Sequence, residues 1–245
     1  MAQHIAIPVS SSDSEYNGRS LPPYLEALEA AGALPEVIAL DTPPARVARL
    51  LANVSGVLLP GSRFDVDPER YGERRIGACN EADPARTAVD ELLLQDAFNL
   101  RKPILAICYG MQSLNVWCNG SLIQDLGAEG LTKVNHAPGR HVAEAHGIVM
   151  APGSRLEAIA QARPPLARVN SSHHQAVRVP GDHLRVTAVS QEDQVIEAVE
   201  LEDADHFVVG VQWHPERTYE ASGLSRGIFA AFVRAAAAWR LPFGQ

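Results

Sequence analysis

Short apolar runs alternate with amphipathic stretches along the first half of the chain. Runs typical of buried strands lie at 4–9, 36–40, 56–59 and 103–108. Stretches with apolar residues at helical spacing lie between them, at 22–31, 44–51 and 87–99. Gly32 is placed to cap the first of these helices, and Pro44 falls in the first turn of the second. Strands that alternate with helices predict an α/β fold with a doubly wound, mostly parallel central sheet and flanking helices.

The pattern changes after residue 130, where short segments rich in β-branched residues follow one another. They lie at 141–150, 167–169, 184–190, 195–201 and 207–212, and they predict extra β-strands in mixed or antiparallel pairing in the C-terminal half. An Ala-rich stretch at 225–239 predicts a closing helix, and the polar stretch 63–85 predicts a loop on the substrate side. We find no repeat or low-complexity linker, so we expect residues 1–245 to form a single domain.

The composition is that of an ordinary globular enzyme, with 46% of the 245 residues hydrophobic and 20% charged. The formal net charge is -8 and the 21 Lys and Arg residues are scattered, which disfavours a nucleic-acid partner and favours a small-molecule substrate. The first ten residues lack a signal-peptide pattern, and no apolar run reaches the length of about 18 residues that a membrane span needs. We therefore expect a cytoplasmic protein without a membrane partner.

Three cysteines, Cys79, Cys108 and Cys118, cannot all pair with one another, and their spacing matches no zinc motif. We expect free thiols. Cys118 falls where a helix is expected after Cys108 and is interpreted as a buried, inert residue, while Cys79 lies in a loop and is given no role.

Cys108 ends a buried strand and is followed at once by a helix-like run. Ala106 and Gly110, two positions to either side, leave room for a sharp strand-to-helix turn with the thiol at its apex. We expect the N-terminal end of the helix and a nearby imidazolium to hold this thiol as a thiolate. Further along the chain, His214 and Glu216 supply the base and the acid that thiol acyl transfer requires. Each signal is weak alone, and together they predict a catalytic set.

Backbone amides beside Cys108 are candidates for an oxyanion hole. The N–H of Tyr109 points to where an oxyanion would form, and a second donor is expected from Gly61 or Ser62, after the third strand. His214 precedes a proline and is expected to be extended. Because residues two apart in an extended chain project to the same side, Glu216 is expected to reach the ring of His214 and to orient it.

The segment 170–175 reads Asn-Ser-Ser-His-His-Gln and includes the adjacent pair His173 and His174. Two adjacent histidines suggest a metal, yet adjacent residues of an extended chain face opposite ways, and no Asp, Glu or Cys completes a set at ligand spacing. We therefore expect no metal site. The segment is interpreted as a rim that binds a charged end of the substrate, and a polar loop closed by its own hydrogen bonds is the alternative.

With these residues in place, the whole sequence resembles the class I glutamine amidotransferase-like superfamily, and within it the γ-glutamyl-γ-aminobutyrate hydrolases of the C26 peptidase group. The similar segments are 24–35 (YLEALEAAGALP), 58–72 (LLPGSRFDVDPERYG), 83–86 (DPAR), 107–112 (ICYGMQ), 169–177 (VNSSHHQAV), 184–188, 195–198 and 210–216 (GVQWHPE). The cysteine turn and the WHPE segment are highly specific as a pair, and the other segments indicate the subgroup. The resemblance implies the flavodoxin-like fold of this superfamily.

The resemblance also implies an activity and its residues. A triad of Cys108, His214 and Glu216 would cleave a γ-glutamyl amide through a γ-glutamyl thioester, with γ-glutamyl-γ-aminobutyrate as the substrate and glutamate and γ-aminobutyrate as products. No cofactor and no metal are implied. The residues expected around the glutamyl head are Gln112, Ser171, Ser172 and His173. This sequence departs from the common superfamily pattern at Ala106 and Ser62, where glycine is usual, and at Tyr109, where a basic residue is common and where the change bears on the leaving group.

Two other functions stay open on the sequence alone. One is a glutaminase subunit that passes ammonia to a separate synthase; a P-loop is missing and we find no synthetase segment, which favours a stand-alone hydrolase. The other is a binding protein of the same fold that has lost turnover, against which the intact set of three residues argues. Assembly as a homodimer is also left open.

Overall fold

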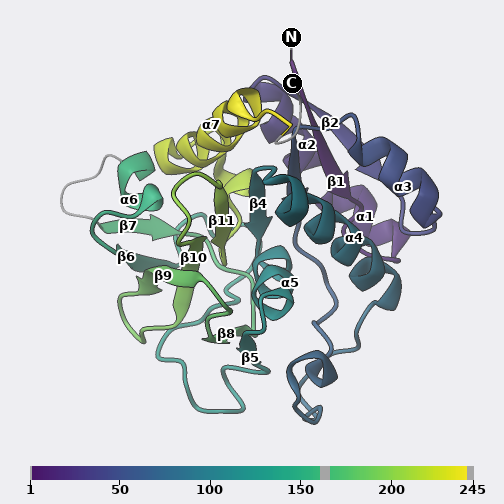
Figure 1. Cartoon of the computed structure of the whole chain (residues 1–245). Helices are drawn as coiled ribbons and strands as arrows, with labels where there is room; N and C mark the ends of the chain where they lie inside the picture. The colour runs from purple at the N-terminus through teal and green to yellow at the C-terminus, as the bar shows by residue number, and fades with distance from the viewer. Residues whose placement is uncertain (1, 161–165, 242–245) are drawn as a thin grey trace.

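The computed structural model describes residues 2–160 and 166–241, and an eleven-stranded sheet passes through this part of the chain (Figure 1). The strands follow the order β2-β1-β3-β4-β11-β10-β9-β6-β7, with β5 and β8 attached beside β10. The parallel strands are β1 (Gln3–Pro8), β2 (Ala33–Ile38), β3 (Gly56–Leu59), β4 (Ile104–Ile107) and β11 (Val208–Val211). The antiparallel part consists of β5 (Ser121–Ile123), β6 (His146–Met150), β7 (Leu166–Val169), β8 (Ala176–Val179), β9 (Leu184–Ser190) and β10 (Ile196–Leu201). The predicted α/β class is confirmed, including the change of pairing in the second half.

Helices cover both faces of this sheet. The first core contains residues of α3 (Pro44–Leu51), α4 (Pro84–Leu100) and α5 (Tyr109–Trp117), and the second those of α2 (Pro22–Ala30), α6 (Arg155–Ala160) and α7 (Gly223–Ala238). In β4, Ile104 and Ala106 pack into the first core, and Leu105 and Ile107 into the second. A strand buried on both faces has no polar alternation, which is why 103–108 is apolar throughout. Among the described helices, none has the length and apolar character needed to cross a membrane.

Local sequence sets the ends of the helices. The Asp83 side chain accepts a hydrogen bond from the Arg86 amide and Pro84 occupies the first turn, so α4 begins slightly before the apolar pattern predicted. The same helix ends at Arg101, whose φ of 55° is left-handed. Gly32 has a φ of 90° directly after α2, which is the conformation its predicted role as a cap requires.

Several short elements were not predicted. They are α1 (Ser14–Ser20), α6, β5, β8 and two 3-10 turns, η1 (Pro68–Tyr71) and η2 (Pro215–Thr218). Each is too short for a hydrophobic period to stand out. The predicted strand 141–150 is wrong in its first half, because pairing with β7 begins at His146 opposite Val169, and 141–145 lie beyond the end of that partner strand.

Candidate active site

Cys108 stands at the junction of β4 and α5, at the carboxyl end of the parallel strands. Its amide donates a hydrogen bond to the Val211 carbonyl oxygen of β11 at 2.8 Å, and its backbone has φ 53° and ψ -110°. A positive φ is strained for a residue with a Cβ and is common where a fold presents a side chain for function. A Cβ on Gly110 would lie 2.1 Å from the carbonyl oxygen of Leu59, so only glycine fits there. The predicted sharp turn at Cys108 is confirmed.

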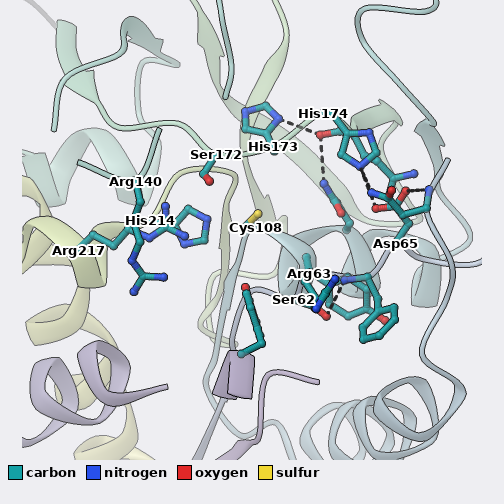
Figure 2. A pocket seen from close by; sticks show the side chains of 16 residues that line it. Ser62, Arg63, Asp65, Cys108, Arg140, Ser172, His173, His174, His214 and Arg217 are labelled. Atoms are coloured by element: carbon teal, nitrogen blue, oxygen red, sulfur yellow. Dashed lines mark hydrogen bonds and ion pairs between the residues drawn. The ribbon is translucent and has the colours of Figure 1, made fainter. Parts of the chain in front are cut away.

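The thiol opens into a cavity of about 280 Å³ that gathers side chains from distant parts of the chain (Figure 2). Three arginines line it, Arg63, Arg140 and Arg217, against one acidic residue, Asp65. Arg63 forms an ion pair with Asp13, and Arg217 Nε lies 3.5 Å from Glu216 Oε1, whereas Arg140 has no carboxylate partner among the described residues. A cavity with this surplus of guanidinium groups favours a ligand that carries carboxylates.

His214 and Glu216 form a buried pair beside the cavity. His214 Nδ1 lies 2.8 Å from Glu216 Oε1, which confirms that the carboxylate reaches the ring. Asn170 holds the backbone of His214 from both sides, donating from Nδ2 to the carbonyl oxygen at 2.7 Å and accepting from the amide at 2.9 Å. Because Nδ1 of His214 faces the Glu216 carboxylate, which can only accept a hydrogen bond, the ring hydrogen is on Nδ1. Nε2 is left free to accept a proton.

The His214 ring and the Cys108 sulfur lie side by side at the cavity in Figure 2. The described residues include no hydrogen bond between the thiol and this ring. Contacts between a nucleophile and its base are often long before the substrate binds and shorten in the complex. The arrangement can therefore support proton transfer from the thiol once a substrate closes the cavity.

The resting protonation states differ from the prediction. Burial raises the pKa of the Cys108 thiol to about 12, although Arg217 and the Tyr109 amide act in the opposite direction. Burial also lowers the pKa of His214, against the influence of Glu216. The expectation of a thiolate held beside an imidazolium is thus wrong for the free protein, because both groups are buried and both favour their neutral forms.

One of the three predicted oxyanion donors is already engaged. The Gly61 amide donates a hydrogen bond to the Tyr24 hydroxyl oxygen at 3.0 Å, so its assignment to the oxyanion hole is corrected. A Cβ on Gly61 would lie 3.0 Å from both His214 Cε1 and the Tyr24 hydroxyl, which is the close approach that glycine permits. Ser62 and Tyr109 both line the cavity, and neither amide donates to a carbonyl oxygen of the described backbone, so these two remain the candidate donors.

The ring of Tyr109 packs into the protein. The guanidinium of Arg86 lies over it at 4.9 Å from the ring centre, and both residues are buried. Arg86 also donates to the carbonyl oxygens of Ser10 and Pro60 and to the carboxylate of Asp90, each at 2.7 Å. A basic side chain at position 109 would meet this buried cation, so the aromatic residue there fits its surroundings.

The residues predicted around the glutamyl head divide into two groups. Gln112, Ser172 and His173 line the cavity, as expected for substrate contacts. Ser171 does not line it: its hydroxyl is buried and donates to the His136 carbonyl oxygen at 2.8 Å, so its assignment is corrected. The Gln112 side chain is fixed by its amide group, which donates to the Gln175 carbonyl oxygen at 3.1 Å.

Other lining residues were not singled out from the sequence as site residues. They are Tyr16, Arg63, Phe64, Asp65, Asn80, Arg140 and Arg217. His174 and Gln175, which belong to the segment 170–175 interpreted from the sequence as a rim, line the cavity as well. The His174 ring lies between Asp65 and Asp125, 3.0 Å from an oxygen of each, and the Asp65 hydrogen bond raises its pKa. Arg217 follows Glu216 directly in the sequence, and this position beside the predicted base and acid was the one signal that could have marked it as a residue of the site.

The two other cysteines are buried and free, as predicted. Cys118 lies at the C-terminal end of α5. Cys79 accepts a hydrogen bond from Gln175 Nε2 at 3.6 Å, so it supports a residue that lines the cavity. Burial raises the pKa of Cys118 to about 12 and that of Cys79 to about 11, so both thiols are protonated near neutral pH.

Comparison with known proteins places this geometry in a family. Residues 7–216 match Peptidase C26. Protein NtpR of Enterococcus hirae is 33% identical over 213 residues, which cover 86% of this chain and 87% of that protein. The gamma-glutamyl-gamma-aminobutyrate hydrolase PuuD of Escherichia coli K12 is 36% identical over 224 residues, which cover 86% of this chain and 84% of that protein.

A solved structure shares the fold at much lower identity. It is a crystal structure of a "putative gmp synthase subunit a protein" from Thermoplasma acidophilum, 14% identical, with a TM-score of 0.64 over 98% of this chain and 96% of that one. That likeness shows the glutamine amidotransferase-like fold. The family match spans most of the length and includes the Cys108 turn and the buried His214–Glu216 pair, and the chain therefore belongs to the Peptidase C26 family.

Proposed function

We propose that the protein is a hydrolase that cleaves the γ-glutamyl amide bond of a small γ-glutamyl amine. The observation that carries this proposal is Cys108, held on a strained turn in an arginine-lined cavity beside the buried pair of His214 and Glu216. The names of the relatives agree with an amide hydrolase of this kind. The cytoplasmic location and the homodimer stay predictions.

The proposed reaction has two halves that use one base. In the first, His214 Nε2 takes the thiol proton as the Cys108 sulfur bonds to the γ-carbonyl carbon, and the amides of Tyr109 and Ser62 stabilise the oxyanion. The C–N bond then breaks, and the leaving amine takes the proton from His214. In the second half, a water gives a proton to His214 and attacks the thioester. The C–S bond breaks, glutamate leaves, and the thiol regains the proton. Glu216 stabilises the imidazolium in both halves.

The charges of the cavity support an amine that carries a carboxylate. The glutamyl part of the substrate has one carboxylate, which leaves guanidinium groups available for a second one on the leaving group. γ-Aminobutyrate has such a group at the end of its chain. We therefore propose γ-glutamyl-γ-aminobutyrate as the substrate, with Arg140 as the contact for the distal carboxylate because it lacks a carboxylate partner among the described residues.

The test compares three amides with the purified protein. γ-Glutamylpropylamine keeps the three-carbon chain of γ-glutamyl-γ-aminobutyrate and lacks the distal carboxylate, and glutamine has ammonia as its leaving group. We expect kcat/KM for γ-glutamyl-γ-aminobutyrate to exceed that for γ-glutamylpropylamine by about tenfold or more, the effect of a hydrogen bond to a charged group. Mass spectrometry of acid-quenched enzyme should find the glutamyl group on Cys108.

A pair of variants assigns the preference to one residue. Arg140→Gln should remove most of the difference between the two amides, whereas Arg49→Gln, an exposed position on α3, should leave it unchanged. Glutamine as the best substrate would contradict the proposal and favour the ammonia-supplying alternative. No turnover of any amide would favour a binding protein.

A further inference from the structure

Three histidines and a glutamate meet inside the protein, on the inner side of the cavity wall. His136 lies before β6, His146 opens β6, His173 lies between β7 and β8, and Glu197 is on β10. All four are at most 5% exposed. One nitrogen of each ring faces Glu197 Oε1, at 3.4 Å for His136 Nδ1, 3.3 Å for His146 Nε2 and 3.5 Å for His173 Nε2. We call these four residues the histidine cluster.

The second nitrogen of each ring faces an acceptor. These contacts are His136 Nε2 to Asp193 Oδ2 at 3.1 Å, His146 Nδ1 to the Gly147 carbonyl oxygen at 3.2 Å, and His173 Nδ1 to the Gln175 carbonyl oxygen at 2.9 Å. Carbonyl and carboxylate oxygens accept hydrogen bonds, so each outer nitrogen carries the hydrogen and each inner nitrogen presents a lone pair. Metal-binding histidines are oriented by their outer nitrogen in this manner.

No donor faces the inner nitrogens or the Glu197 carboxylate at the centre of the cluster, among the residues that the structure describes. His146 Nε2, His173 Nε2 and both carboxylate oxygens of Glu197 have no hydrogen-bond partner in the described part of the chain. His136 Nδ1 lies 3.4 Å from the Ser171 hydroxyl, which donates its hydrogen to the His136 carbonyl oxygen instead. Unpartnered buried polar groups are rare because they lose their hydration without compensation. One proton could join one ring to Glu197, whereas a central cation satisfies all four groups.

Glu200, on the same strand, provides an internal comparison. It is as fully buried as Glu197, and its carboxylate accepts hydrogen bonds from the amides of Arg155 and Leu156 and from the Arg185 guanidinium, at 3.0, 2.8 and 3.2 Å. Both oxygens of this buried carboxylate thus face donors. Glu197 instead faces the lone pairs of three ring nitrogens. A positive charge between these nitrogens and the carboxylate would compensate for its burial.

The spacing of the cluster fits a small divalent ion. Contacts of 3.3–3.5 Å are longer than the 2.7–3.2 Å of an N–H···O hydrogen bond. They equal the edge of a tetrahedron around zinc, which is about 3.3–3.4 Å for bonds of about 2.0–2.1 Å. The four ligand atoms lie within 4.8 Å of one another, so the ion would draw the rings inward by less than about 1 Å each.

We propose that His136, His146, His173 and Glu197 bind one zinc ion in a closed, four-coordinate structural site. Three imidazoles and a carboxylate are a ligand set that zinc accepts, and four protein ligands in a buried place leave no open position for a substrate. The expectation of no metal was based on local spacing, and it missed a carboxylate that folding brings from β10. The adjacent His174 is not part of this set, because its ring contacts Asp65 and Asp125 whereas the His173 ring contacts Glu197.

The site would fix one wall of the cavity to the sheet. His173 is both a cluster member and a cavity residue, and its amide donates to the His136 carbonyl oxygen at 2.9 Å. The bound ion would thus join the segments that carry Ser172 and Arg140 to β6 and β10. Because Cys108 follows β4 and is not one of the four ligands, the ion would position substrate contacts and take no part in the bond changes.

Elemental analysis of untagged protein, purified from cells grown with zinc, gives the first test. We expect about one zinc per chain, because closed structural sites bind zinc tightly. Glu197→Gln and His146→Gln should each reduce the content to below about a tenth of that value, whereas Glu200→Gln should leave it unchanged. Cys108→Ala should also retain the metal, which excludes zinc held by the catalytic thiol.

A second measurement avoids variants that fail to fold. Wild-type protein is stripped with a chelator and titrated with Co²⁺, whose absorption in the visible range is strong when four ligands surround it tetrahedrally. We expect saturation at one equivalent, displacement by Zn²⁺ and a rise in Tm on binding. Stripped protein that takes up neither ion, or that keeps its Tm when it does, overturns the proposal. Loss of uptake in Cys108→Ala overturns it as well.

Discussion

The corner formed by Cys108, His214 and Glu216 and the histidine cluster both bring imidazoles to a buried carboxylate, and they do so at different distances. In the corner, one ring meets Glu216 at 2.8 Å, and that ring has its other nitrogen free. In the cluster, three rings meet one oxygen of Glu197 at 3.3–3.5 Å, and each ring has its outer nitrogen bound. Our proposals accordingly assign proton transfer to the corner and cation binding to the cluster.

This difference shows which feature of a buried histidine reports its role. Burial is nearly the same in both places, so exposure alone does not separate them. The two groups are separated by the number of nitrogen and oxygen lone pairs that point to the same place. A proton has one donor and one acceptor, while a metal ion takes four or more ligands at once.

Replacing Cys108 with Ala should have the largest effect on activity. Without the thiol no thioester forms, so we expect turnover to fall by about 10⁴-fold or more. The alanine side chain fits the same turn, and the Tm should stay within a few degrees of wild type. Kinetics on γ-glutamyl-γ-aminobutyrate and thermal unfolding measure both. Activity within tenfold of wild type would mean that Cys108 is not the nucleophile.

His214→Ala should come next and should exceed Glu216→Gln. Loss of the ring removes the base for both halves of the reaction, with an expected fall of about 10³-fold or more. Glu216→Gln keeps a hydrogen-bond acceptor for Nδ1, and it should retain about tenfold more activity than His214→Ala because the acid orients the ring and does not carry the proton.

The metal content separates this corner from the cluster. His214→Ala and Glu216→Gln should both keep the zinc content of wild type, since neither side chain belongs to the histidine cluster. Equal and negligible effects of the two substitutions on turnover would place the base elsewhere in the cavity, with His173 and His174 as the other imidazoles there.

The two groups also differ in how far the sequence could reveal them. The parallel half of the fold, the Cys108 turn and the reach of Glu216 to His214 depend on residues that are neighbours in the chain, so local pattern was enough. The cluster depends on antiparallel pairing that aligns β6, β7 and β10 across many residues. The protonation of Cys108 was missed for a related reason, because burial is a property of the whole fold.

Removal of the metal should weaken substrate binding more than the chemical step. The proposed ion fixes the segments of Ser172 and Arg140, while Cys108 and His214 are held at the ends of β4 and β11. We expect KM to rise by about tenfold, which corresponds to one charged contact, with kcat changed by less than about threefold. Restored KM on adding one equivalent of Zn²⁺ is the control. A fall in kcat alone would place the ion in the chemistry.

The smallest expected effect is a shift of the pH profile, and it tests the neutral pair in the catalytic corner. His214 is the active base only when unprotonated, and burial places its pKa below the ordinary 6.5. As the pH rises through that pKa, kcat/KM should rise to a plateau, so the midpoint should fall below pH 6.5. Glu216 acts to raise the pKa of His214, so Glu216→Gln should move the midpoint to still lower pH. The thiol, with a pKa of about 12, stays protonated across the plateau.

A thiolate beside an imidazolium would behave differently, because kcat/KM would then fall on the alkaline side as the imidazolium lost its proton. A profile of that shape would show that the corner holds a thiolate and an imidazolium at rest.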